Sequence, residues 1–154
     1  MKLIQLTLGQ FAQVDDRWFE ELNQYKWYAH KNGSTYYAER EYAGVTIFMH
    51  RVIMSTPKEL VVDHIDHNGL NCLEENMRNC TRQQNRMNLL PHGGSKYLGV
   101  SYHTTKGYTY IKAQIRYDGV THHIGLFPTE EDAARAYDEK AKEHHGEFAN
   151  LNFK

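Results

Sequence analysis

Cysteine, proline and long apolar runs are scarce in this chain of 154 residues. It holds two cysteines and three prolines, and no segment approaches the roughly 18 consecutive apolar residues of a membrane-spanning helix. Cys72 and Cys80 do not form a CxxC pair, and they are too few for the disulfide framework of a small secreted domain or for a cysteine-rich zinc site. The start of the chain also lacks an apolar signal region. We therefore expect a soluble cytoplasmic protein without a membrane partner.

A charge excess of one sign is also missing, since the net charge is -1. The charges are nevertheless unevenly distributed. Residues 96–127 hold four lysines or arginines against one aspartate, a net of +3, whereas residues 128–147 hold three against seven acids, a net of -4. A basic face backed by an acidic one can bind an anion despite a neutral sum.

The first 50 residues alternate short strand-like runs with turns. Asn32-Gly33 lies between two aromatic runs and is a strong hairpin signal. The apolar run 46–54 is expected to end before Pro57. We interpret this whole segment as an aromatic packing module, and the sequence does not indicate its function.

Residues 59–90 have the pattern of two strands followed by a helix. The strands are predicted at 59–63 and 76–80, with a turn at 67–71 between them. Thr81 followed by Gln84 is a capping-box signature, so a helix is predicted to begin at Thr81 and to stop before Pro91. Asn85 then falls in the first two turns, where it can face the strand.

The remaining residues predict a sheet packed on one helix. Three strand-like runs cover 97–103, 108–117 and 120–127, and a helix follows with Thr129 as N-cap and Gly146 as C-cap. Apolar and polar residues alternate along 111–116, so one sheet face should meet the helix and the other should be polar. The predicted class is α+β: small N-terminal strands, a hairpin with a helix, and then this three-stranded antiparallel sheet.

Polar residues between positions 63 and 85 admit two kinds of cation site. A calcium loop starting at His64 is matched by Asp66, Asn68, Gly69 and Glu75, but histidine stands where the loop needs a first aspartate. The other interpretation is a one-metal nuclease, in which a histidine accepts a proton from water near neutral pH and oxygen ligands hold a cation. A carboxylate with an amide oxygen suits Mg²⁺ or Mn²⁺.

The stretch "DHIDHNGLNCLEENMRNCTRQQN", residues 63–85, resembles the HNH motif of phage and intron-encoded homing endonucleases. That family has a two-stranded hairpin and a helix around one divalent metal. The resemblance implies that Asp63 and Asn85 are the metal ligands of one ion per chain, that His64 is the general base, and that Asn76 is the central asparagine holding the loop and the base in place.

Residues next to this motif receive lesser roles. "MHR" at 49–51 is similar to the segment that precedes the motif, and we assign His50 a structural role. Asp66, His67 and Asn68 are interpreted as turn-forming residues. Arg82 and Arg86, one helical turn apart, either contact phosphates or form a solvated helix face.

The C-terminal part, residues 96–153, resembles the plant ethylene-response-factor (Apetala-type) DNA-binding domain. The similarity lies in "YLGVSYH", "AQIR", "HIGLF", "EEDAARAYDEKA" and "GEFANLNF". In that family a three-stranded sheet enters the DNA major groove. The resemblance implies that the polar sheet face contacts double-stranded DNA through Ser101, His103, Lys112, Gln114, Arg116, Thr121 and His123. Plant domains commonly have arginine or tryptophan at contact positions, so weak, salt-sensitive or shape-dependent recognition is expected.

The sequence thus predicts a site-directed, homing-type DNA endonuclease that leaves 5'-phosphate and 3'-hydroxyl ends. The nuclease is expected in residues 1–90 with its core at 60–90, a linker at 91–95 and the Apetala-type domain at 96–154. If it is phage-encoded, the site of action is the host cytoplasm or nucleoid. The alternative is a non-cleaving, sequence-specific DNA-binding protein with a structural HNH remnant. Nicking by one chain and double-strand cleavage by a dimer both fit.

Overall fold

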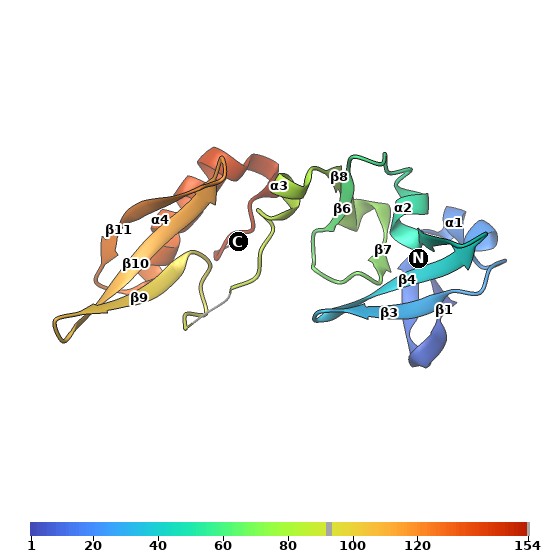
Figure 1. The fold of residues 1–154 in the computed structure, drawn as a ribbon, viewed down its shortest axis with the longest axis horizontal. Coiled ribbons are helices and arrows are strands. Elements are labelled where there is room, and N and C mark those ends of the chain that lie inside the picture. Colours follow the sequence, from blue (N-terminus) through green and yellow to red (C-terminus); the bar gives the residue numbers. More distant parts are fainter. Residues whose placement is uncertain (92–93, 154) are drawn as a thin grey trace. The chain divides into compact units, whose positions relative to one another are not determined.

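Two compact units, Met1–Asn85 and Arg86–Lys154, divide the chain in the computed structural model, which describes residues 1–91 and 94–153 (Figure 1). His92 and Gly93 of the predicted linker lie outside the described residues. Across the described ranges, no helix combines the length and the apolar character needed to span a membrane.

Short strands separated by turns build most of the N-terminal unit. They pair into sheets of order β1-β2-β7, β3-β4-β5 and β6-β8, and every pairing is antiparallel except β2 with β7. The strands are β1 (Lys2–Gln5), β2 (Phe11–Val14), β3 (Tyr28–Asn32), β4 (Thr35–Tyr42), β5 (Val45–Phe48), β6 (Val61–His64), β7 (Asn71–Cys72) and β8 (Met77–Cys80). The helical elements are η1 (Thr7–Gly9), α1 (Asp16–Leu22), α2 (Met49–Ile53), η2 (Glu74–Asn76) and α3 (Arg82–Asn85).

The predicted hairpin at Asn32-Gly33 is present as β3 and β4. Gly33 has a φ of +60°, which an L side chain rarely adopts, and the ladder closes with Asn32 opposite Thr35. Because side chains alternate along a strand, Ala29 and Ala38 lie on the buried face of this hairpin. Tyr37 lies on the opposite face.

The core of the N-terminal unit gathers buried apolar side chains from all three sheets, among them Ile4, Ala38, Trp27, Met49 and Met77. Trp27 is only 1% exposed, and its indole Nε1 donates a 2.8 Å hydrogen bond to the Leu22 carbonyl oxygen. The apolar run predicted to end before Pro57 becomes β5 and α2, and Met49 of α2 is fully buried. This burial anchors the start of α2 against the sheets.

The capping box predicted at Thr81 is confirmed. The Gln84 backbone N–H donates to Thr81 Oγ1 at 3.2 Å, and the Thr81 N–H donates to Gln84 Oε1 at 2.8 Å. The helix α3 nevertheless ends at Asn85, so its predicted extension to Leu90 was wrong. A turn at residues 86–87 follows, and then the buried Asn88; asparagine side chains compete with helical backbone bonding.

The C-terminal unit is an antiparallel sheet packed on one helix, as the sequence predicted. The sheet has the order β11-β10-β9, and its buried Ala113 and Ile115 form apolar clusters with residues of the helix such as Ala134 and Tyr137. Its elements are β9 (Val100–Thr105), β10 (Tyr108–Tyr117), β11 (Val120–Phe127), α4 (Glu130–His145) and η3 (Gly146–Phe148). The α+β class is therefore confirmed.

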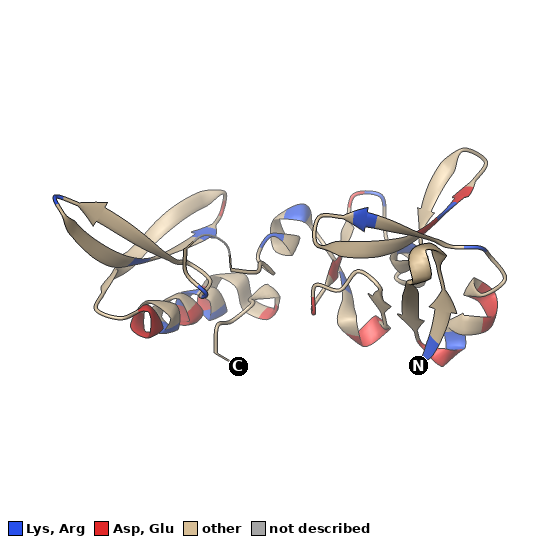
Figure 2. Cartoon of the chain, turned by 90° about the horizontal axis from the view of Figure 1, so that it is seen from below, with Lys and Arg blue, Asp and Glu red and all other residues tan. Residues whose placement is uncertain are grey.

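Both predicted ends of α4 are also confirmed. Thr129 Oγ1 accepts a hydrogen bond from the Asp132 N–H at 3.1 Å, and Gly146 follows the last helical residue with a φ of +55°. Glu130, Glu131 and Asp132 occupy the first turn, and acidic residues recur along the helix (Figure 2). Negative charge at a helix N-terminus is favourable because the helix dipole is positive there.

Candidate active site

Asp63 and His64 are consecutive residues at the end of β6, and both are buried, with 3% and 6% of their surface exposed. The antiparallel ladder places Asp63 opposite Arg78 and His64 opposite Met77 on β8. Consecutive side chains of a strand point to opposite faces. One strand end therefore presents a carboxylate and an imidazole in different directions.

An ion pair joins Asp63 to Arg78 across the hairpin. Arg78 donates hydrogen bonds to Asp63 Oδ2 from Nε at 2.9 Å and from Nη2 at 2.7 Å. A buried charge is tolerated when it is paired and hydrogen-bonded. Sequence reasoning missed Arg78, because a long loop separates the two predicted strands and their register could not be fixed in advance.

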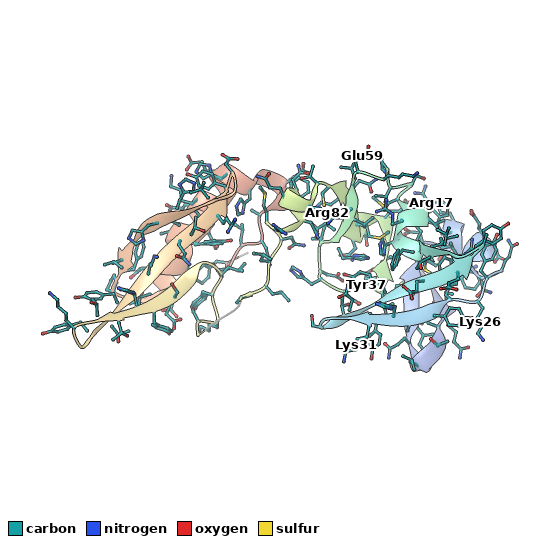
Figure 3. All side chains as sticks on the ribbon, in the orientation of Figure 1. Arg17, Lys26, Lys31, Tyr37, Glu59 and Arg82 are labelled. Carbon is teal, nitrogen blue, oxygen red and sulfur yellow. The ribbon has the colours of Figure 1, made fainter. Side chains whose placement is uncertain are left out.

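His64 lies against two other aromatic side chains. Its ring meets Tyr37 edge-on at a centroid distance of 5.7 Å and His50 at 5.3 Å, and Figure 3 shows Tyr37 on the β3–β4 hairpin. Burial lowers the pKa of His64, while the carboxylates of Asp66 and Asp63 act in the opposite direction. The imidazole is therefore uncharged at neutral pH, which is the form that accepts a proton.

His50 was assigned only a structural role from sequence, and Tyr37 was not singled out at all. The similarity of "MHR" to the segment before the motif was the available signal for His50. Tyr37 carried no such signal, because its proximity to His64 depends on how the β3–β4 hairpin packs against a distant segment.

Asn76 fastens the loop that follows His64. Its Oδ1 accepts from the Asp66 backbone N–H at 3.1 Å, and its Nδ2 donates to Asp66 Oδ1 and to the Asn71 carbonyl oxygen, both at 2.9 Å. Its backbone carbonyl oxygen accepts from the Ile65 N–H at 2.9 Å. Asn76 is 9% exposed, so these bonds are shielded from water. The asparagine thus links the start of the loop to its end.

The loop itself is held by hydrogen bonds among its polar side chains. Asp66 accepts from the Asn68 N–H at 2.8 Å and from Asn71 Nδ2 at 2.7 Å. Burial raises the pKa of Asp66, but the hydrogen bonds from Asn71, Asn68 and Asn76 outweigh it and hold the pKa below its usual value. The loop joins two strands, β6 and β7, rather than two helices, and this flanking structure argues against a calcium loop of the helix-loop-helix type.

The other predicted ligand, Asn85, is the last residue of α3, which packs beside β6. The Cys80 thiol, at the end of β8, has a pKa above its ordinary value. Burial and the charge of Asp63 raise the pKa of this thiol, whereas Arg78 and backbone hydrogen bonds from Asp63 and Asn85 lower it.

The donor set at these positions is one carboxylate and one amide oxygen. Among the residues that the structure describes, no group of three or more His, Cys, Asp or Glu side chains could hold a metal ion. A cation bound by Asp63 and Asn85 would therefore complete its coordination with water or substrate oxygens. Hard oxygen donors with open positions suit Mg²⁺ or Mn²⁺ and do not suit a closed zinc site.

The polar residues predicted on the C-terminal sheet share one face. The register pairs Ser101 with Lys112 and Gln114 with His123. It also pairs Arg116 with Thr121 and His103 with Tyr110. This face is opposite the one that carries the buried Ala113 and Ile115. It also contains Tyr110 and Leu126, which the sequence analysis did not select.

Arg82 and Arg86 do not share a helix. Arg82 is the first residue of α3 and is exposed (Figure 3), whereas Arg86 follows the helix end and belongs to the C-terminal unit. The expectation that both lie within one helix was wrong, because α3 ends at Asn85 and Arg86 is the next residue. Both side chains are exposed, so a phosphate contact by each of them stays a prediction.

The chain is similar to a curated protein of Acanthamoeba polyphaga mimivirus that is named as an uncharacterized HNH endonuclease. The two are 37% identical over 147 residues, which cover 94% of this chain and 75% of the viral protein. No family model and no solved structure matches the chain.

Proposed function

The chain belongs to the HNH endonuclease family, and on that basis we propose that it is a site-directed, metal-dependent endonuclease of double-stranded DNA, of the homing type. The observation that carries this proposal is the buried pair at the end of β6. A carboxylate and an uncharged imidazole occupy adjacent positions there, beside the helix that carries Asn85.

His64 is the general base in this proposal. Its pKa is lowered by burial, so the imidazole is free of a proton at neutral pH and removes one from water. The resulting hydroxide attacks the phosphorus atom, and the bond from phosphorus to the 3' oxygen breaks. The phosphate stays on the 5' end, and the leaving oxygen takes up a proton to become a 3'-hydroxyl.

Asp63 and Asn85 would hold one Mg²⁺ or Mn²⁺ ion per chain. When bound, such an ion neutralises negative charge on the phosphate and on the leaving oxygen. The chain's own residues set the surroundings: Arg78 orients the Asp63 carboxylate through two hydrogen bonds, and Asn76 keeps the loop after His64 in one conformation.

Target selection is assigned to the C-terminal unit as an Apetala-type domain. Its outer sheet face combines Lys112 and Arg116, which can contact phosphates, with Gln114 and His123, which can donate to or accept from base edges. The net charge of +3 over residues 96–127 supports binding to a polyanion.

A supercoiled plasmid incubated with the protein tests this function directly. With Mg²⁺ we expect conversion to nicked or linear DNA, and with EDTA we expect none. End-labelling of the products should find 5'-phosphates and 3'-hydroxyls. Cleavage that persists in EDTA, or ends of the opposite polarity, would contradict the mechanism.

The ion pair between Arg78 and Asp63 favours a second candidate, a DNA-binding protein that does not cut. In that case the guanidinium stands permanently where a cation would otherwise balance the carboxylate. A protein of this kind shifts DNA in a gel but leaves the plasmid supercoiled at every Mg²⁺ concentration. The plasmid assay therefore separates the two candidates.

A further inference from the structure

Two aromatic rings from other parts of the sequence, Tyr37 and His50, contact the His64 ring. Besides the contacts of Tyr37 and His50 with His64, these two rings touch each other edge-on, with centroids 5.4 Å apart and planes at 70°. Phe48 stacks on His50 at 5.4 Å with the planes 19° apart. The rings belong to β4, β5, α2 and β6, so side chains from four elements form one aromatic cluster that includes His64.

We propose that Tyr37 and His50 are positioning residues that fix the plane of the His64 imidazole, a role that rests on the proposed nuclease function. Tyr37 and His50 approach His64 with interplanar angles of 64° and 89°. An imidazole that turned about its side-chain bond would drive its edge into one of these rings. A general base must stay aligned with its water, because small misplacements of reacting groups strongly reduce rate.

The loop after His64 packs closely against Tyr37. Gly69, in the loop after His64, approaches Tyr37 so closely that an added Cβ would lie 2.6 Å from the tyrosine Cε1 and 2.5 Å from the Tyr36 carbonyl oxygen. The Gly69 N–H also donates to Thr35 Oγ1 at 2.9 Å. The β3–β4 hairpin and the loop after the base are therefore fastened together at this point.

Neither positioning ring exchanges a proton near neutral pH. Burial, His64 and Arg51 lower the pKa of His50 to about 3, so this imidazole stays uncharged. Burial and the charge of Asp63 raise the pKa of Tyr37, so its hydroxyl keeps its proton. The two rings thus keep constant charge, and their contribution is steric contact around His64.

Substitutions that remove or keep the ring at Tyr37 and His50 distinguish a positioning role from a role in proton transfer. Tyr37→Leu and His50→Ala should each lower the single-turnover rate of plasmid cleavage by about tenfold or more, with unchanged affinity for plasmid DNA. Tyr37→Phe and His50→Phe should recover most of that loss because they restore a ring. Matched controls are Tyr42→Leu and His30→Ala, two exposed side chains of the same sheet.

The proposal is wrong if folded Tyr37→Leu and His50→Ala variants cut at the wild-type rate, or if they weaken DNA affinity alone. It is also wrong if the two Phe variants cut as slowly as the variants that lack the ring. A second measurement covers variants that fail to fold. In the wild type, NMR relaxation dispersion should find a single, unexchanging environment for the His64 ring, and exchange between ring orientations would refute fixation. A wild type that never cuts refutes the nuclease function instead, while the NMR result still decides the ring positions.

Discussion

Arg78 lies directly across the β6–β8 ladder from Asp63 and donates two hydrogen bonds to one oxygen of its carboxylate. The carboxylate is almost fully buried, and 19% of the arginine side chain is exposed. The hairpin thus carries its own counter-charge for the residue that we propose as a metal ligand. Asp63 is therefore oriented before any cation binds.

Arg78→Met should destabilise the fold by about 3 to 5 kcal/mol, because it removes the guanidinium that pairs with the buried Asp63 carboxylate. Urea denaturation followed by circular dichroism measures the change in the free energy of unfolding. The double variant Asp63→Leu with Arg78→Met should recover much of the loss, since it removes both charges. Wild-type stability of the single variant would show that the pair is not needed to hold the hairpin.

His64→Ala should reduce the rate of plasmid cleavage by about 10² to 10⁴-fold, the usual contribution of a general base. DNA affinity, measured by gel shift in EDTA, should stay at the wild-type value, because His64 belongs to the N-terminal unit and DNA binding is assigned to the C-terminal unit. A parallel loss of cleavage and affinity would mean that the histidine holds the fold rather than the chemistry.

The free energy of unfolding should fall as the pH is lowered from about 6.5 toward 3, and the lowered pKa of His50 should account for part of this fall. The pKa of His50 is about 3 in the folded state, against an ordinary value of 6.5. Between these pH values the unfolded chain binds the extra proton, so acid favours unfolding. His50→Phe removes this contribution, and its unfolding free energy should vary less with pH than that of the wild type. Identical pH profiles would contradict the lowered pKa.

Lys112→Ala and Arg116→Ala should each weaken DNA binding and make the dependence of affinity on salt shallower by about one counterion per removed contact. Fluorescence anisotropy at several NaCl concentrations measures both quantities. Lys140→Ala is the matched control, because that lysine lies on α4 and pairs with Glu143. Equal effects of all three substitutions would mean that total charge, rather than the outer sheet face, governs binding.

Local sequence signals predicted most of the elements. Thr81 with Gln84 marked the start of α3, Asn32-Gly33 marked the β3–β4 turn, and Thr129 with Gly146 marked both ends of α4. Each of these signals acts through backbone bonds within a few residues, so it is visible in a short window of sequence. The early end of α3 was missed because no proline or glycine marks it.

The contacts around the candidate site were less accessible to sequence reasoning. Arg78 meets Asp63 through strand register, and a long loop containing β7 and η2 separates the two strands, so no tight turn fixes that register in advance. Tyr37 and His50 reach His64 only after three sheets have packed on a shared core. Packing of this kind leaves no local pattern.

The buried state of Cys72 and Cys80 has a practical consequence for fluorescent labelling. Neither forms a disulfide, burial raises the pKa of Cys72 to about 12, and the Cys80 thiol is also held above its usual value. Thiol reagents react with the thiolate, so both native cysteines should be inert to a maleimide dye at neutral pH. A Thr105→Cys variant, altered at an exposed position, would then accept the dye selectively, and its emission would report in real time whether the sheet docks on a duplex as proposed.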